Sequence, residues 1–108
     1  MKIDAATFRE LQESAGAEFV VELVDTFLDE GPRMLAELRA AWDAGSADPF
    51  RRAAHSLKSN ALTFGATDLA ALARDLETGG LPAERAPVDA LEQAFQSAAT
   101  ALKELAHG

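Results

Sequence analysis

The stretch VDALEQAFQSAATALKEL, residues 88–105, decides the fold. Its large apolar residues and one alanine recur at intervals of three or four positions: Val88, Leu91, Phe95, Ala98, Leu102 and Leu105. This spacing places the side chains on one face of an α-helix. An apolar face of this length must be covered by neighbouring helices, so the stretch predicts a long helix within a helical bundle.

A second long helix is predicted over residues 20–42, where apolar side chains recur with the same spacing. The dipeptide Gly31-Pro32 interrupts it, and a proline inside a helix costs about 3 kcal/mol and bends or breaks the helix. The apolar face nevertheless keeps its phase from Val24 before the proline to Trp42 after it. We therefore predict one helix with a kink at the proline.

A short first helix is predicted from its capping residues. Asp4 is a suitable N-cap, and Ile3 and Phe8 have the spacing of a hydrophobic staple around it. Gly16 is suited to end the helix.

Two more helices follow from similar signals. Asp48 is the expected N-cap of the third helix, Pro49 its first residue and Gly65 its end. The fourth is expected over residues 67–78, followed by two glycines and a linker that leads into the stretch 88–105. The sequence thus predicts an all-α fold, an antiparallel four-helix bundle with a short additional N-terminal helix at one end. At 108 residues the whole chain, 1–108, is expected to form a single domain.

The composition limits the kinds of partner that the chain is expected to bind. The net charge is -8 and the isoelectric point about 4.6, so nucleic acid and anionic membrane surfaces would repel the chain. No apolar run reaches the roughly 18 to 20 residues that cross a bilayer, and the first ten residues lack the apolar stretch of a secretory signal. The absence of cysteine fits a reducing compartment. We expect a cytoplasmic monomer whose partner is a protein.

Positive charge gathers around one of the two histidines, in RRAAHSLKSNALTFGA, residues 51–66. At 100° per residue, one face of this helix collects its apolar side chains: Phe50, Ala53, Ala54, Leu57, Ala61 and Phe64. His55 falls about 160° from Leu57 and is expected to face water. The same outward half of the helix carries Arg51, Arg52, Lys58, Ser59 and Leu62.

These neighbours suit a phosphorylated histidine. Residues three and four apart on a helix are adjacent, so Arg51, Arg52 and Lys58 are within reach of the imidazole. Three cations would disfavour a proton on the ring and would stabilise a phosphoryl group attached to it. Leu62 adds an apolar side chain that a partner could cover. The alternative is an ordinary solvated histidine on a charged helix face.

The stretch AHSLKSNALTFGATDLAALARDLE, residues 54–77, resembles the signature of histidine phosphotransfer (HPt) domains. The preceding stretch, with its proline inside the second helix, is similar to the family as well. The resemblance implies a small helical bundle that passes phosphoryl groups between the aspartates of receiver domains, with His55 as the phosphorylated residue. Lys58 takes the place of the family's lysine. Ser59 stands where most members have glycine; because serine is small, we expect function to persist.

The resemblance also implies a division of labour with the partner, which is a response-regulator receiver domain, a hybrid histidine kinase, or both. The receiver supplies the phosphorylated aspartate and a Mg²⁺ ion, so this domain binds no cofactor and acts as a carrier without an enzyme's nucleotide site. The sequence itself contains no phosphate-binding glycine-rich loop. The third and fourth helices should form a hairpin about Gly65, which places Glu77 near His55. Its carboxylate could accept a bond from one ring nitrogen and turn the other outward.

Three other classes of protein share some of these features. A helical adaptor would use Leu62 and the basic residues for binding and leave His55 without a covalent role. A di-iron bundle needs an inward Glu-x-x-His motif, but Arg52 stands three residues before His55. The dimerisation domain of a sensor kinase carries an acidic residue just after its histidine, where this chain has Ser56. His107 is most simply explained as part of a frayed helix end.

Overall fold

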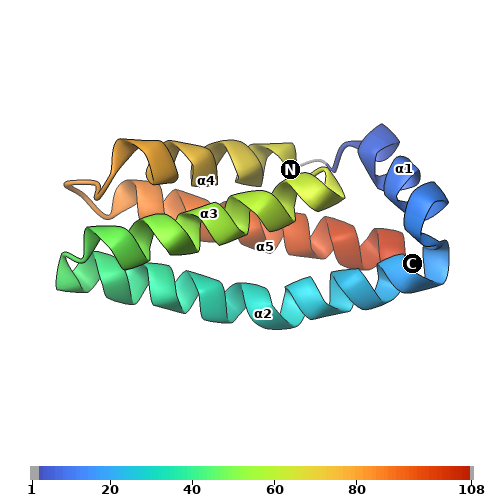
Figure 1. The fold of residues 1–108 in the computed structure, drawn as a ribbon, viewed down its shortest axis with the longest axis horizontal. Coiled ribbons are helices and arrows are strands. Elements are labelled where there is room, and N and C mark those ends of the chain that lie inside the picture. Colours follow the sequence, from blue (N-terminus) through green and yellow to red (C-terminus); the bar gives the residue numbers. More distant parts are fainter. Residues whose placement is uncertain (1–2, 108) are drawn as a thin grey trace.

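The computed structural model describes residues 3–107 and contains five helices in this part of the chain. They are α1 (Ala5–Ala15), α2 (Ala17–Ala44), α3 (Ala47–Phe64), α4 (Thr67–Gly79) and α5 (Ala86–His107). The last four form an antiparallel bundle in which α2 contacts α3 and α5, and α4 contacts the same two helices (Figure 1). α1 lies across one end of the bundle (Figure 1). The predicted all-α fold is therefore confirmed.

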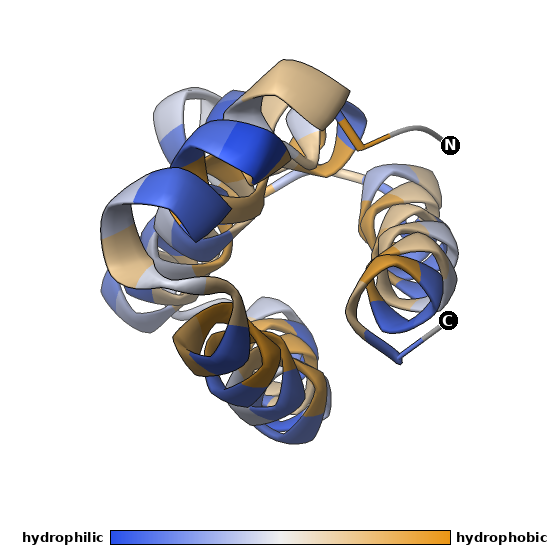
Figure 2. Cartoon of the chain, turned by 90° about the vertical axis from the view of Figure 1, so that its right-hand side faces the viewer, coloured by the Kyte–Doolittle hydropathy of each residue, from blue (hydrophilic) through white to orange (hydrophobic). Residues whose placement is uncertain are grey.

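The core is built from the predicted apolar faces. Figure 2, a view along the bundle, shows the helices arranged around a common interior. Five of the six members of the α5 face are buried there: Val88, Leu91, Phe95, Ala98 and Leu102. The sixth, Leu105, was expected to be covered but is 50% exposed, because the covered part of the face ends one turn before the helix does.

Among the described helices, none has the length and apolar composition needed to span a membrane.

α2 runs without interruption through Pro32, as its apolar phase predicted. Its ribbon bends near the middle (Figure 1). Gly31, directly before the proline, is buried against α5, and a Cβ atom built there would lie 2.2 Å from two ring atoms of Phe95. The missing side chain therefore allows Phe95 to approach the backbone of α2.

The start of α3 differs from the prediction. Ser46, and not Asp48, is the N-cap, and Pro49 is the third helical residue instead of the first. The first four N–H groups of a helix have no partner within it. Phe50 donates the first helical bond, to the carbonyl of Ser46 at 3.3 Å. Pro49 precedes that donor, so its missing N–H is as harmless at the third position as at the first.

The α3–α4 turn is closely defined. Gly65 has φ 78°, in the left-handed region that favours glycine, and the Ala66 N–H bonds to the Ala61 carbonyl at 2.9 Å, which is a Schellman closure of α3. The Gly65 carbonyl accepts a bond of 2.8 Å from the backbone N–H of Asp4. Asp4 also caps α1, as predicted, by accepting from the Thr7 N–H at 3.1 Å. These bonds hold the turn against α1.

The opposite end of the bundle is held by polar contacts of α2. Trp42 donates its indole N–H to the carbonyl of Pro82, in the α4–α5 linker, at 2.9 Å. One turn earlier, Arg39 forms ion pairs with Asp89, at 2.8 Å, and with Glu92. These contacts fasten the linker and the first turns of α5 to α2.

Candidate functional site

His55 projects from the outer face of α3. Its neighbours Ala54 and Leu57 are completely buried, and all six residues of the predicted inner face belong to the core. The side chain of His55 is 55% exposed. The outward orientation predicted from the helical wheel is therefore confirmed.

Glu77, on α4, joins His55 to Lys58. One carboxylate oxygen, Oε2, lies 2.6 Å from Nδ1 of His55, and the other, Oε1, lies 2.7 Å from the Lys58 ammonium. The Glu77 side chain is only 15% exposed, although it carries a charge. The hairpin about Gly65 thus brings together three side chains from two helices.

The ammonium of Lys58, and after it the bond with His55, hold the pKa of Glu77 below its ordinary value. The carboxylate is therefore ionised at neutral pH and can only accept hydrogen bonds. It follows that Nδ1 of His55 carries the proton and donates to Glu77. In the neutral ring, Nε2 then keeps its lone pair, which is the state required of a nucleophile.

The charges near the ring include the Glu77 carboxylate as well as the predicted cations. Lys58 was predicted to be one of three cations within reach of the imidazole; its ammonium, 23% exposed, is paired with the same Glu77 carboxylate that contacts the ring. The closest charged group to the ring is the Glu77 carboxylate. Arg51 and Arg52 are exposed and, within residues 3–107, have no ion-pair partner. The imidazole is therefore in contact with one carboxylate, and two arginines without ion-pair partners in the described part of the chain precede it on α3.

The two remaining predicted residues are accessible. Ser59, four residues after His55, is exposed. Leu62, nearly two turns after His55, is 54% exposed. Both lie on the predicted outward half of α3. The side-chain hydrogen bond of the ring in the described structure is with Glu77, not with Ser59.

Grooves run along both sides of α3. The α2–α3 groove, of about 520 Å³, includes Glu37, Arg52 and Ser56 in its wall. The α3–α4 groove, of about 280 Å³, is lined by six residues: Lys58, Leu62, Thr67, Ala70, Ala71 and Arg74. Lys58 belongs to this second groove and also to the Glu77–His55 cluster, so the groove begins beside the site.

Arg74 was not singled out from the sequence. In the hairpin, Lys58 lies level with Arg74 just as His55 lies level with Glu77, and Lys58 and Arg74 line the same groove. The available signal was the spacing about the turn, because Lys58 and Arg74 both lie eight residues from Ala66, and residues equally far from a helical turn face each other across it. The wheel of one helix could not supply that information.

His107 also differs from its expected state. It lies within α5, and its Nε2 is 2.7 Å from the Asp25 carboxylate of α2, so it is not a frayed end. In residues 3–107 no three side chains of metal-binding type gather at one place.

The fold and the site together define a helical bundle that presents, on the outer face of α3, a histidine oriented by a carboxylate of α4. The family model described as Hpt domain matches residues 22–104, so the chain belongs to the histidine phosphotransfer family. Domains of this family are phosphocarrier modules of two-component signalling that interact with receiver domains and histidine kinases. No curated protein matches the chain, and neither does any solved structure.

Proposed function

We propose that this chain, as a single domain over 1–108, is a phosphotransfer protein that exchanges a phosphoryl group between His55 and the aspartate of a receiver domain. The observation that carries the proposal is the 2.6 Å contact between Nδ1 of the exposed His55 ring and the ionised Glu77. This contact orients the ring and leaves the lone pair on Nε2.

The transfer step follows from that orientation. The Nε2 lone pair attacks the phosphorus of the aspartyl phosphate, a new N–P bond forms, and the P–O bond to the aspartate breaks. The aspartate leaves as a carboxylate with the electron pair of that bond, while the Nδ1 proton stays on the ring. Reversal of the same step returns the phosphoryl group to an aspartate. The protein's task is to hold the nucleophile in line with the breaking bond.

Charge balance assigns roles to the neighbours. The ring that carries both the phosphoryl group and the Nδ1 proton is positively charged, and the Glu77 carboxylate is placed to balance that charge. Lys58 holds Glu77 in position from its other oxygen. Arg51 and Arg52, four and three residues before His55, are free to pair with phosphoryl oxygens.

The rest of the chemistry belongs to the partner. A receiver domain supplies the phosphorylated aspartate and Mg²⁺, so the carrier needs no nucleotide or cofactor of its own. The identity of the receiver or kinase, the cytoplasmic location and the monomeric state stay predictions.

The test uses a panel of receiver domains that carry a radiolabelled phosphoryl group, and measures transfer of that group to this chain. We expect acid-labile label on the chain, abolished by His55→Gln. His107→Gln is the matched control, because it removes the only other histidine, and it should keep the label. Label that persists in His55→Gln would contradict the assignment. Stable binding of a receiver without any label would favour the adaptor.

A further inference from the structure

We infer that the receiver docks along the α3–α4 groove, with Arg74 and Leu62 as the residues that select it. This inference rests on the proposed function, because it concerns the partner that must reach His55. The groove shares Lys58 with the His55 cluster, so a protein that meets Nε2 of His55 lies next to it.

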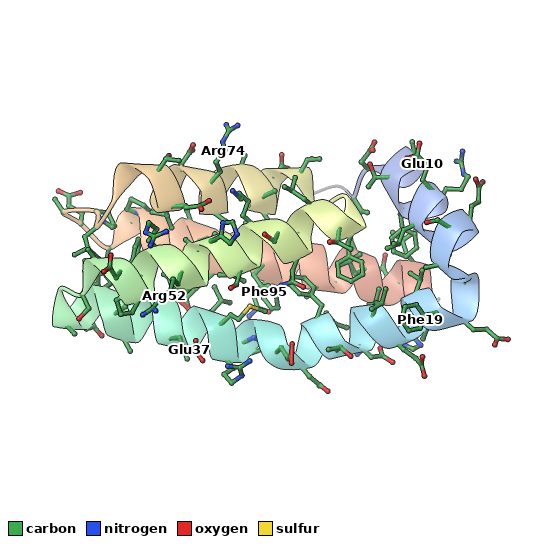
Figure 3. All side chains as sticks on the ribbon, in the orientation of Figure 1. Glu10, Phe19, Glu37, Arg52, Arg74 and Phe95 are labelled. Atoms are coloured by element: carbon green, nitrogen blue, oxygen red, sulfur yellow. The ribbon has the colours of Figure 1, made fainter. Side chains whose placement is uncertain are left out.

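Leu62 supplies the apolar part of this surface. Three large hydrophobic side chains are exposed within residues 3–107: Phe19, Leu62 and Leu105. Only Leu62 lies on the helix of His55, seven residues and about 10 Å further along its axis. Phe19 lies at the end of the bundle near α1 (Figure 3). A partner that buries a standard area of roughly 800 Å² covers a disc of about 16 Å radius, so a partner centred on His55 includes Leu62.

Arg74 supplies the charge. Its side chain projects outward from α4 (Figure 3), and no carboxylate in the described part of the chain pairs with it. The only other charged residue lining the groove is Lys58. The groove is therefore positive in a molecule whose net charge is -8.

The groove on the other side of α3 has a different character. Its wall includes Glu37, whose carboxylate is paired with Arg33 at 2.6 Å, and Arg52, which has no ion-pair partner among the described residues. Its one large apolar residue, Met34, is buried. Charge alone therefore does not distinguish the two grooves, but a partner in this one would find no exposed large hydrophobic side chain to cover among the described residues that line it.

The α3–α4 groove thus fits a face that combines at least one carboxylate with an apolar side chain beside the phosphorylated aspartate. A receiver must place its aspartyl phosphate, and the acidic groups that hold Mg²⁺ there, against His55. Paired charges of this kind raise association rates and exclude wrong partners.

The experiment compares two phosphoryl donors. Arg74→Glu and Leu62→Ser are labelled by the receiver that reacts fastest with the unmodified chain, and separately by phosphoramidate, a small donor that needs no docking surface. We expect each variant to lower the initial rate from the receiver by about tenfold, as expected for central interface residues. The rate from phosphoramidate should change less than about twofold.

Matched controls lie outside both grooves. Arg9→Glu, on α1, makes the same change of charge, and Leu105→Ser removes a side chain of nearly equal exposure, 50% against 54%. Both should react with the receiver like the unmodified chain. The inference would be overturned if the receiver labelled Arg74→Glu and Leu62→Ser at the same initial rate as the controls. The proposed function would then remain intact. An unmodified chain that takes no label from any receiver would overturn both.

Discussion

Glu77 binds Nδ1 of His55 and leaves Nε2 without this partner. It is a shielded carboxylate with a cation on one oxygen and an imidazole on the other, at 2.7 and 2.6 Å. In the proposed reaction its part is to position the ring and balance its charge, because only the ring would meet the phosphoryl group.

Replacement of Glu77 by glutamine should therefore change the tautomer of His55. The amide has no charge and can either donate or accept, so the preference for a proton on Nδ1 should weaken. Long-range ¹⁵N–¹H spectra, recorded well above the pH range in which histidine titrates, will report the protonated nitrogen. Label transfer from a receiver should fall by about tenfold or more, since hydrogen bonds to charged groups are worth roughly 1.5–3 kcal/mol in general.

Asp75→Asn is the matched control, because it removes an exposed carboxylate two residues earlier on α4. It should leave the tautomer and the transfer rate unchanged. A Glu77→Gln protein with the tautomer of the unmodified chain would show that the carboxylate does not orient the ring.

The pH dependence of the Glu77 contacts has a definite sign. The folded pKa lies below the ordinary 4.5, so the ionised form is favoured by folding. Its contribution to stability is fully present above pH 4.5 and is lost as the pH falls through the lower, folded pKa. In urea unfolding, the difference in stability between the unmodified chain and Glu77→Gln should thus shrink only in acid.

At the scale of elements, the contact between α2 and α5 depends on Gly31. Phe95 packs edge-on against Phe27, with ring centroids 5.4 Å apart, and its ring occupies the space that a Cβ at position 31 would need. The kink residue Pro32 follows directly, so the close approach and the bend occur at the same point of α2.

Gly31→Ala should destabilise the bundle. Alanine favours a helix over glycine by about 1 kcal/mol, but forcing a methyl group into a packed core typically costs roughly 1–3 kcal/mol. A clash at 2.2 Å lies at the upper end of that range, so we expect a net loss of about 1–2 kcal/mol in urea unfolding followed by circular dichroism. Gly79→Ala, where a Cβ meets nothing within 4 Å, should be neutral or slightly stabilising. If Gly31→Ala leaves the free energy of unfolding unchanged, the ring of Phe95 can move aside.

At the scale of the molecule, the buried face of α5 is satisfied within one chain. The core encloses its members up to Leu102. We therefore expect a monomer of 11.4 kDa in sedimentation equilibrium at micromolar concentration. A dimer that Leu105→Ser dissociates would contradict this and would identify the exposed last turn as an interface.

Much of this architecture could be predicted because it depends on periodicity and caps. The core face of α3, the continuity of α2 and the caps at Asp4 and Gly65 all follow from local rules. The approach of Glu77 to His55 was also predicted, from the hairpin, but the other contacts of charged side chains across helices were not. Lys58 was placed near the imidazole correctly along α3, but its pairing with Glu77 depends on how α4 packs. Arg74 was missed for the same reason.

Trp42 has a practical consequence. It is the only tryptophan of the chain, and its indole N–H is bonded to the α4–α5 linker. Indole emission is sensitive to loss of such a bond and to entry of water, so the protein contains an intrinsic fluorophore that reports when the linker separates from α2. Because this fluorophore lines neither groove of α3, stability can be followed optically without a dye near His55.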